Sequence, residues 1–279
     1  MKKITDNTPD KPRGGGKGSE SAFKVGFLII FLAYIAGLVI LFLATILFID
    51  FATFKTCVMD PEIQFSVKLS FITATITTII VIIIGVPSAY ALSRYKIPAG
   101  TFVDTILDLP IVLPPPVVGI CLLILFRHPI VKQMVATTGV EFVYTQRGII
   151  LAQFAIASAF GIRAMKAAFD SINPRLEQVA RTLGCNSFQT FLHVTLPLAK
   201  NGLIAGIVMT WARSIAEFGP ILFFCGATRM KTEVMPVALF LNLSIGNIEM
   251  TVAICIVMMM VSTITLIIFK KLGGKGYLW

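Results

Sequence analysis

The chain has 279 residues, of which 56% are hydrophobic and only 14% are charged, and its mean hydropathy is +0.87. A soluble domain of this length could not bury so much apolar surface, so the composition excludes an ordinary soluble protein and indicates one surrounded by lipid. The net charge of +10 follows the positive-inside rule along the chain, so it indicates topology and not a nucleic-acid partner.

Residues 1–21 are polar and rich in Gly, Lys and Pro, which predicts a disordered cytoplasmic tail. Its GGGKG run lacks the spacing and the Ser or Thr of a P-loop, so we expect no nucleotide site in the chain. Residues 22–50 form the first predicted membrane span, because the run from Val25 to Ile49 is uncharged and long enough to cross a bilayer. The run is longer than a signal-peptide core, and Asp50 follows it without a cleavage pattern, so we expect the span to be retained.

Five more apolar stretches follow the first span. Each crossing needs roughly 20 mostly apolar residues, so the sequence predicts an all-α integral membrane protein with about six transmembrane helices and both ends in the cytoplasm. The stretches are Phe71 to Leu92, Leu109 to Phe126, Gly148 to Ile162, Leu198 to Gly226 and Met250 to Phe269. We expect Arg163 and Lys166 to extend the fourth span by snorkelling to the interface. Arg127, Lys132 and Arg147 lie on the outer side in this topology, against the positive-inside trend.

The third span opens with a proline-rich segment. Four prolines within seven residues, Pro110, Pro114, Pro115 and Pro116, prevent a regular helix, because each lacks an N–H donor and restricts the residue before it. Two interpretations are open: the prolines lie at the interface before the helix begins, or they break the span and line a translocation path. Irregular backbone at membrane depth needs protein or water around it, so in both cases this span faces protein more than lipid.

The fifth span contains two charges, Arg213 and Glu217, ahead of the pair Gly219-Pro220. The two charged residues are four positions apart, so they lie on one helix face and can pair. Charges inside a span are costly and usually mark a pathway or an interior ion pair. Both interpretations are open here: a structural pair, or a path in which Arg213 guides an anion and Glu217 limits how tightly the anion is held.

Residues 164–197 form the predicted cytoplasmic loop between the fourth and fifth spans. Asn173-Pro174 fits an N-cap with proline at the first helical position, and Gly184 fits the glycine that ends a helix. Between them an apolar stripe with helical spacing is formed by Leu176, Val179, Ala180 and Leu183. A second short helical pattern includes Phe188, Phe191, Leu192 and His193. The first helix is too short to be stable alone in water, so it must dock on the bilayer surface or on a cytoplasmic partner.

This loop resembles the EAA loop of ABC importer permeases. The stretch from Gln178 to Gly184 and the later Val194-Thr195-Leu196-Pro197 match E-A-A-x-x-x-G and I-x-L-P with the family's spacing, although Gln178 holds the glutamate position and Glu177 stands one step earlier. In such permeases the short helix sits in a groove of the ATPase subunit and transmits its closure. The resemblance gives this ATPase-coupling role to Leu176, Glu177, Gln178, Val179, Ala180, Arg181, Leu183 and Gly184.

Two further stretches are similar to the molybdate, tungstate and sulfate permeases, the oxyanion branch of that family. The segment from Leu109 to Gly119 looks like the L-P-L-V-L-P-P segment of molybdate permeases, and the segment from Ala212 to Gly219 is similar to their A-R-S-L-G-E-F-G, with Ala216 in place of a glycine. The resemblance implies a translocation path or gate at Pro114, Pro115, Pro116, Arg213, Glu217, Phe218 and Gly219.

The resemblance therefore implies a type I-like permease fold, with a core domain over residues 63–272, in the cell (inner) membrane. It implies the permease subunit of an ATP-driven importer for an oxyanion, molybdate or tungstate before sulfate, working as a homodimer with an extracytoplasmic substrate-binding protein. ABC ATPase subunits would use the ATP and Mg, so we expect this chain to bind no cofactor and to catalyse no reaction itself. The five cysteines and two histidines offer no metal-ligand spacing. The alternatives are a sulfate or other small-solute permease, or a secondary transporter with broken helices near Pro114 and Pro220.

Overall fold

The computed structural model describes residues 17–272, and all the regular elements in this range are helices, which confirms the predicted fold class. In chain order they are α1 (Lys17–Leu47), α2 (Phe51–Val58), α3 (Pro61–Arg94), α4 (Gly100–Val112), α5 (Pro115–Arg127), α6 (Pro129–Thr138), α7 (Gln146–Asp170), α8 (Pro174–Thr182), α9 (Ser187–Thr190), the π-helix η1 (Phe191–Thr195), α10 (Leu196–Ile215), α11 (Gly219–Cys225), α12 (Met235–Ser244) and α13 (Ile248–Leu272). The chain divides into two compact units, Met1–Phe48 and Ile49–Trp279.

The described part of the first unit is the single helix α1. Its stretch Phe23–Leu47 is long and apolar enough to cross a membrane, and none of its most apolar window is buried by the chain itself. A helix that is apolar on all sides and has no protein cover is suited to lipid. The helix begins at Lys17, so the prediction of a disordered tail is wrong for residues 17–21, and residues 1–16 lie outside the described range.

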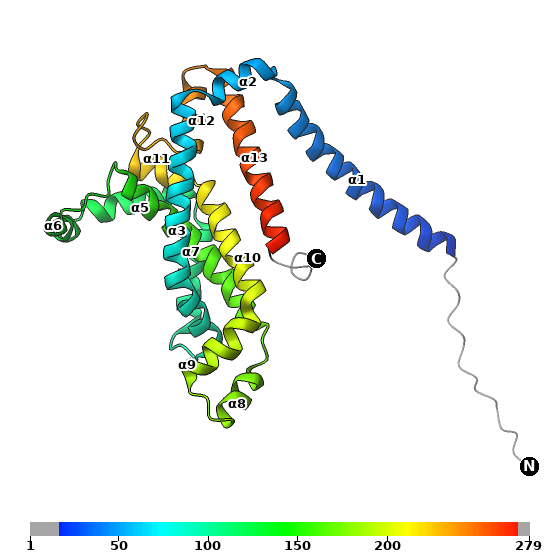
Figure 1. Cartoon of the computed structure of the whole chain (residues 1–279), viewed down its shortest axis with the longest axis vertical. Helices are drawn as coiled ribbons and strands as arrows, with labels where there is room; N and C mark the ends of the chain where they lie inside the picture. Colours follow the sequence, from blue (N-terminus) through cyan, green and yellow to red (C-terminus); the bar gives the residue numbers. More distant parts are fainter. Residues whose placement is uncertain (1–16, 273–279) are drawn as a thin grey trace, which may run out of the picture. The chain divides into compact units, whose positions relative to one another are not determined.

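In the second unit α7 packs against both α3 and α10 (Figure 1). Small residues allow these helices to approach closely, as they do in many membrane proteins. A Cβ atom added to Gly161 of α7 would lie 2.2 Å from Thr210 Oγ1 on α10, and one added to Gly206 of α10 would lie 2.9 Å from Met165 Cγ. The three helices therefore form the tightly packed body of this unit.

A buried amide joins these three helices in the interior. Gln153 of α7 donates from Nε2 to the Ser214 carbonyl oxygen at 3.0 Å and to Thr73 Oγ1 at 3.2 Å. Its Oε1 accepts from Thr77 Oγ1 at 3.0 Å. Hydrogen bonds between helices at apolar depth stabilise membrane proteins by roughly 0.6–2 kcal/mol each. Gln153 therefore fixes the positions of α3 and α10 relative to α7.

The proline-rich segment breaks the third span. Helices α4 and α5 meet at Leu113 and Pro114 and are bent by 112° relative to each other. Pro115 begins α5, where its missing N–H costs nothing, and Pro114 adopts the extended conformation that a residue before proline favours. Pro110 lies inside α4, and Pro115 and Pro116 open α5, so the proline run coincides with a bend between two helices. That this segment lines a translocation path stays a prediction.

The fifth span differs from its predicted range, 198–226. The continuous helix runs from Ser187 to Ile215, and α11 is a separate short helix. The sequence suggested a boundary at Pro197, but η1 carries the helix past it: the Leu196 N–H donates to the Phe191 carbonyl, five residues back. This wider π turn accommodates the missing donor of Pro197.

Within residues 17–272, five helices are long and apolar enough to cross a membrane, and there are six when the bent α4–α5 pair is counted as one span. This agrees with the predicted number of spans. Arg163 of α7, predicted to snorkel to the interface, forms ion pairs with Asp104 at 2.8 Å and with Asp108 at 2.6 Å, both on α4. Lys166 likewise pairs with Asp170 at 2.6 Å. The first two ion pairs fasten α4 to α7.

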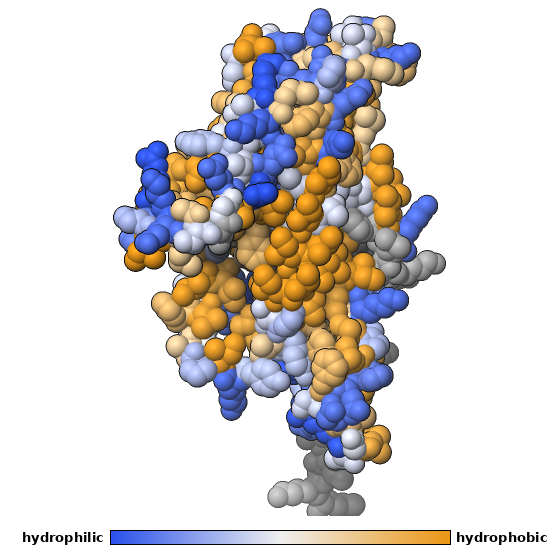
Figure 2. Space-filling view, turned by 60° about the vertical axis from the view of Figure 1, so that its left-hand side comes forward, coloured by the Kyte–Doolittle hydropathy of each residue, from blue (hydrophilic) through white to orange (hydrophobic). Residues whose placement is uncertain are grey.

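Two short helices mark opposite ends of the second unit. Helix α8 lies at one end, and α12 lies at the other (Figure 1); we call these the α8 end and the α12 end. On the face drawn in Figure 2, hydrophobic residues gather in a band between two more hydrophilic ends. This distribution is the one expected of a protein that spans a bilayer.

Candidate functional site

The candidate coupling helix, α8, has well-defined ends. Asn173 caps its start by accepting the Arg175 N–H on Oδ1 at 3.0 Å, and Pro174 takes the first helical position. At its end the Gly184 N–H donates to the Arg181 carbonyl and the Cys185 N–H to the Ala180 carbonyl, with Gly184 at φ 95°. These two bonds form a Schellman motif. The predicted helix start and end are therefore confirmed.

The orientation of α8 is unusual for an amphipathic helix. Leu176, Val179 and Leu183 are 47%, 55% and 81% exposed, whereas Glu177 is 6% exposed and Ala180 is 8% exposed. Three of the four stripe residues therefore face away from the rest of the chain, whereas Ala180 and the acidic residue face inward. Gln178 and Arg181, also predicted to couple, are exposed. Glu177 and Ala180, also predicted to couple, pack inside the chain, so their part in coupling stays a prediction and would act through their own chain.

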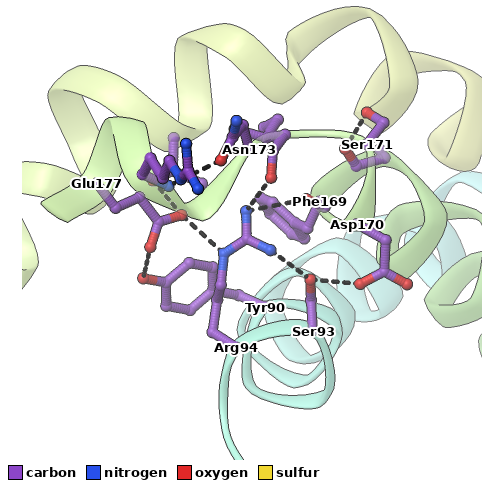
Figure 3. Close-up of polar contacts among 12 residues, drawn as sticks. Tyr90, Ser93, Arg94, Phe169, Asp170, Ser171, Asn173 and Glu177 are labelled. Carbon is purple, nitrogen blue, oxygen red and sulfur yellow. Dashed lines mark hydrogen bonds and ion pairs between the residues drawn. The ribbon is translucent and has the colours of Figure 1, made fainter.

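Glu177 is held by residues from two other helices (Figure 3). Its Oε1 accepts from Arg94 Nε at 2.8 Å and from Thr195 Oγ1 at 3.0 Å. Its Oε2 accepts from the Tyr90 hydroxyl at 3.3 Å. Tyr90 and Arg94 are at the end of α3, and Thr195 closes η1. A buried carboxylate is stable when it is paired and hydrogen-bonded in this way.

Arg94 extends this network to the end of α7 (Figure 3). Its Nη2 donates to the carbonyl oxygens of Phe169 at 3.0 Å and Ile172 at 3.1 Å, and its Nη1 donates to Ser93 Oγ at 2.9 Å. These carbonyls lie in the last turn of α7 and just past its end, and the planar guanidinium binds both of them together. We call Arg94, Glu177, Tyr90 and Thr195 the α8 latch. The sequence prediction missed it, because nothing local in the chain links residue 94 to residue 177.

The two predicted path motifs come together in the structure. A Cβ added to Gly219 would lie 2.8 Å from Pro116 N, and one added to Gly119 would lie 2.7 Å from Pro220 Cα. Because each glycine has no side chain, a proline of the other motif can lie directly against its backbone, and α5 packs on α11. We call this contact the glycine–proline interlock. It places the break between α4 and α5 beside the break between α10 and α11.

Arg213 and Glu217 form the predicted ion pair, with 2.9 Å between Arg213 Nη1 and Glu217 Oε2. The Glu217 side chain is 2% exposed and that of Arg213 is 27% exposed. Arg213 also lies over the Phe160 ring, with its Cζ 5.5 Å from the ring centroid, which adds a cation–π contact. Phe218, which follows Glu217 in the chain, packs its ring against that of Phe240, with 5.6 Å between the ring centroids. The pair is therefore adjacent to the glycine–proline interlock.

At the α12 end, the loop over residues 226–234 is held by a buried acid. Glu233 accepts the Met230 N–H on Oε2 at 2.8 Å, and no hydrogen-bond partner is found for Oε1 among the described residues. Beside it lies Glu62, whose carboxylate is bound by Arg229 and accepts from Asn242 Nδ2 at 3.1 Å. Burial, and then the neighbouring Glu62, raise the pKa of Glu233 to about 7.

The raised pKa predicts that this loop is pH-sensitive. Glu233 holds its proton more tightly in the folded loop than in the open one, so its contribution to stability is fully present below its ordinary pKa of 4.5 and is lost as pH rises through about 7. We expect amide exchange in residues 226–234, corrected for intrinsic rates, to speed up on the order of tenfold or more between pH 5 and pH 8. The variant Glu233→Gln should abolish this dependence. The exposed-acid variant Glu249→Gln is the control, and an unchanged pH dependence in Glu233→Gln would refute the assignment.

A hollow of about 550 Å³ opens near the same loop, lined in part by Arg147, Lys231 and Glu141. Gln146 at the start of α7 donates to the Lys231 carbonyl oxygen at 3.0 Å and so fixes one wall. Within residues 17–272, neither Arg147 nor Lys231 forms an ion pair. Arg147, which opposes the positive-inside trend, and Lys231 are therefore two exposed basic residues beside an open hollow.

Comparison with known families and relatives agrees with this architecture. Residues 81–275 match the family described as "Binding-protein-dependent transport system inner membrane component". The chain is 32% identical over 228 residues to the molybdate/tungstate transport system permease protein WtpB of Pyrococcus furiosus, covering 81% of this chain and 85% of that one. It is 33% identical over 217 residues to the molybdenum transport system permease protein ModB of Escherichia coli, covering 77% and 94%. It is also 30% identical over 227 residues to the sulfate transport system permease protein CysT of Salmonella typhimurium, covering 81% and 82%.

Among solved structures, a bacterial ABC transporter that imports the acidic polysaccharide alginate has a similar chain, with a TM-score of 0.71 at 20% identity over 91% of this chain and 94% of that one. At this identity the likeness is one of fold. The family match begins within α3 and covers α7, all four residues of the α8 latch and both path motifs. The chain belongs to the binding-protein-dependent transport system inner membrane components, the permease subunits of ABC transporters.

Proposed function

We propose that this chain is the permease subunit of an ATP-driven importer for a tetrahedral oxyanion, molybdate or tungstate before sulfate. The observation that carries the proposal is α8, a well-capped helix whose leucines and valine face outward while its acid is fixed inside. A short helix with an exposed apolar stripe needs a partner surface, and helix-in-groove docking is a common way to bury such a stripe. ABC ATPase subunits, which hold ATP and Mg, would supply the groove.

The substrate class is supported by the relatives, which include molybdate/tungstate, molybdenum and sulfate permeases. Arg213 supports it physically, because it is a cation at a break between two apolar helices, beside the glycine–proline interlock. The partly neutralised charge suits a path: an unpaired cation would hold a dianion too tightly to release it. Two copies of the chain would form this path between them.

The predicted topology puts the α8 end in the cytoplasm and the α12 end outside. An extracytoplasmic binding protein would then meet Arg147 and Lys231 at the hollow on the α12 end. Two basic residues beside Glu141 give this hollow a mixed charge, which suits a protein surface that carries charges of both signs more than a free anion.

Reconstitution tests the proposal as a whole. The chain, its ATPase subunit and its binding protein in liposomes should accumulate labelled molybdate or tungstate only when all three and ATP are present. Raising the salt concentration should weaken the response to the binding protein, because exposed charges are screened. Uptake driven by an ion gradient without ATP would instead support a secondary transporter, the reading that the two broken spans leave as the second candidate.

The apolar stripe of α8 gives a more local prediction. Replacing Leu176, Val179 and Leu183 together with alanine keeps the helix propensity of α8 but removes its docking surface. We expect affinity for the ATPase subunit to fall by at least about tenfold, since a buried apolar anchor at an interface contributes over 1 kcal/mol. The affinity is measured by titrating the purified ATPase subunit onto the permease in nanodiscs.

The control is a variant with Thr182→Ala and Lys200→Ala, which changes exposed positions outside the stripe and should bind normally. Equal affinity of the stripe variant and the wild type would show that α8 is not the docking element. Loss of binding in the control alone would show that the docking surface lies on another face.

A further inference from the structure

The α8 latch is a second feature of the coupling helix, beyond its exposed stripe. A helix that only docks on a partner needs its outer face, but α8 also buries a charged residue toward its own chain. Burying Glu177 costs several kcal/mol in lost hydration unless its partners compensate for it. Three side chains from α3 and η1 make that compensation, at 2.8 Å, 3.0 Å and 3.3 Å. The arrangement therefore fixes α8 to particular spans.

The partners of the α8 latch lie on three spans, α3, α7 and α10. Tyr90 and Arg94 tie α8 to α3, and Thr195 ties it to η1, which continues directly into α10. Arg94 also holds the Phe169 and Ile172 carbonyls at the end of α7. The Tyr90 ring packs against Phe169 at 5.6 Å and Phe191 at 4.8 Å between centroids, so apolar contacts follow the same connections. Among the described residues, α4 forms no hydrogen bond with the latch; its ion pairs are with Arg163, earlier in α7, and its Leu107 packs on the same apolar cluster as Phe169 and Ile172.

We infer that Glu177 is a positioning residue for transport: through Arg94 and Thr195 it makes α8 one body with the adjoining ends of α3, α7 and α10. A displacement of α8 then moves those three spans together, instead of being absorbed by rotation of α8 on its two connecting loops. This rests on the proposed function, in which ATPase subunits displace α8. It assigns to the inward-facing acid a role separate from the outward docking stripe.

The test separates docking from transmission. Wild type, Glu177→Gln and the matched control Lys200→Gln, each of which exchanges one charge for an amide, are reconstituted with the ATPase subunit and binding protein. Three quantities are measured: the ATPase-to-permease ratio after purification, the ATP hydrolysis rate, and the substrate accumulated per ATP hydrolysed. We expect Glu177→Gln to keep the purification ratio and to hydrolyse ATP, but to accumulate at least fivefold less substrate per ATP. Lys200→Gln should match the wild type in all three.

Two milder variants protect the test against misfolding. Tyr90→Phe and Thr195→Val each remove one hydroxyl and leave the ion pair intact, and each should lower substrate per ATP by a smaller factor. If Glu177→Gln does not fold, the substrate accumulated per ATP by Tyr90→Phe and Thr195→Val decides whether the inference holds. Wild-type substrate per ATP in Glu177→Gln, or in both milder variants, overturns the inference while leaving the proposed function intact. If the wild-type chain retains no ATPase subunit, the proposed function fails and the inference fails with it.

Discussion

Replacing Glu217 with Gln should lower the free energy of unfolding in detergent by about 2–3 kcal/mol, because it leaves the Arg213 charge without its partner. The value is set below that for a fully buried pair, since the Arg213 side chain is 27% exposed and water screens it in part. The double variant Arg213→Met with Glu217→Gln should recover most of the loss, because neither charge then remains. Denaturant titration of the wild type and the two variants measures both effects.

The same variants decide between the two roles of the pair. A pair that serves only structure predicts that Glu217→Gln assembles poorly but transports normally per assembled complex. A role in the path predicts normal assembly with a changed rate, since the unscreened cation would retain the oxyanion. A Glu217→Gln protein that is as stable as the wild type would contradict the structural role.

Adding a methyl group at the glycine–proline interlock should have an effect of similar size. Gly219→Ala places a Cβ 2.8 Å from Pro116 N and 2.9 Å from Pro115 Cβ, closer than such atoms approach in folded proteins. The nearest groups are backbone and proline rings, which cannot rotate away, so α5 and α11 must separate. We expect a loss of about 1–3 kcal/mol in stability, as for other overpacked sites, and a lower yield of the folded protein.

Gly119→Ala should behave in the same way, because its Cβ would lie 2.7 Å from Pro220 Cα on the other side of the contact. Gly100→Ala is the matched control, since an added Cβ at that glycine meets nothing within 4 Å. Thermal unfolding in detergent compares the three. If Gly119→Ala and Gly219→Ala unfold at the temperature of Gly100→Ala, the close contact of α5 with α11 does not exist in solution.

The elements with strong local signals were predictable from the sequence. Uncharged runs of sufficient length predicted the spans, and the proline run predicted a break in the third. The ends of α8 followed from Asn173, Pro174 and Gly184, whose side chains and backbone preferences act within a few residues. These signals depend on chemistry between sequence neighbours, so a single sequence was enough to find them.

The features that sequence reasoning missed depend on distant contacts. An acid at position 177 gives no local sign that it will meet Arg94 of α3, so the inward orientation of α8 was not predicted. Snorkelling was the reasonable expectation for Arg163 until the fold placed Asp108 beside it. The meeting of the two path motifs likewise requires knowing that α5 and α11 are neighbours, which neither motif contains.

The π-helix η1 makes the chain sensitive to length at one place. A π turn accommodates one more residue than an α turn, so η1 is equivalent to a single-residue insertion between α9 and α10. Deleting one residue from 191–195 would restore regular α-helical phase, and everything before it would turn by about 100° about the helix axis relative to α10. Thr195 and Glu177 would then no longer face each other. The rotational position of α8 relative to α10 therefore depends on one extra residue in η1.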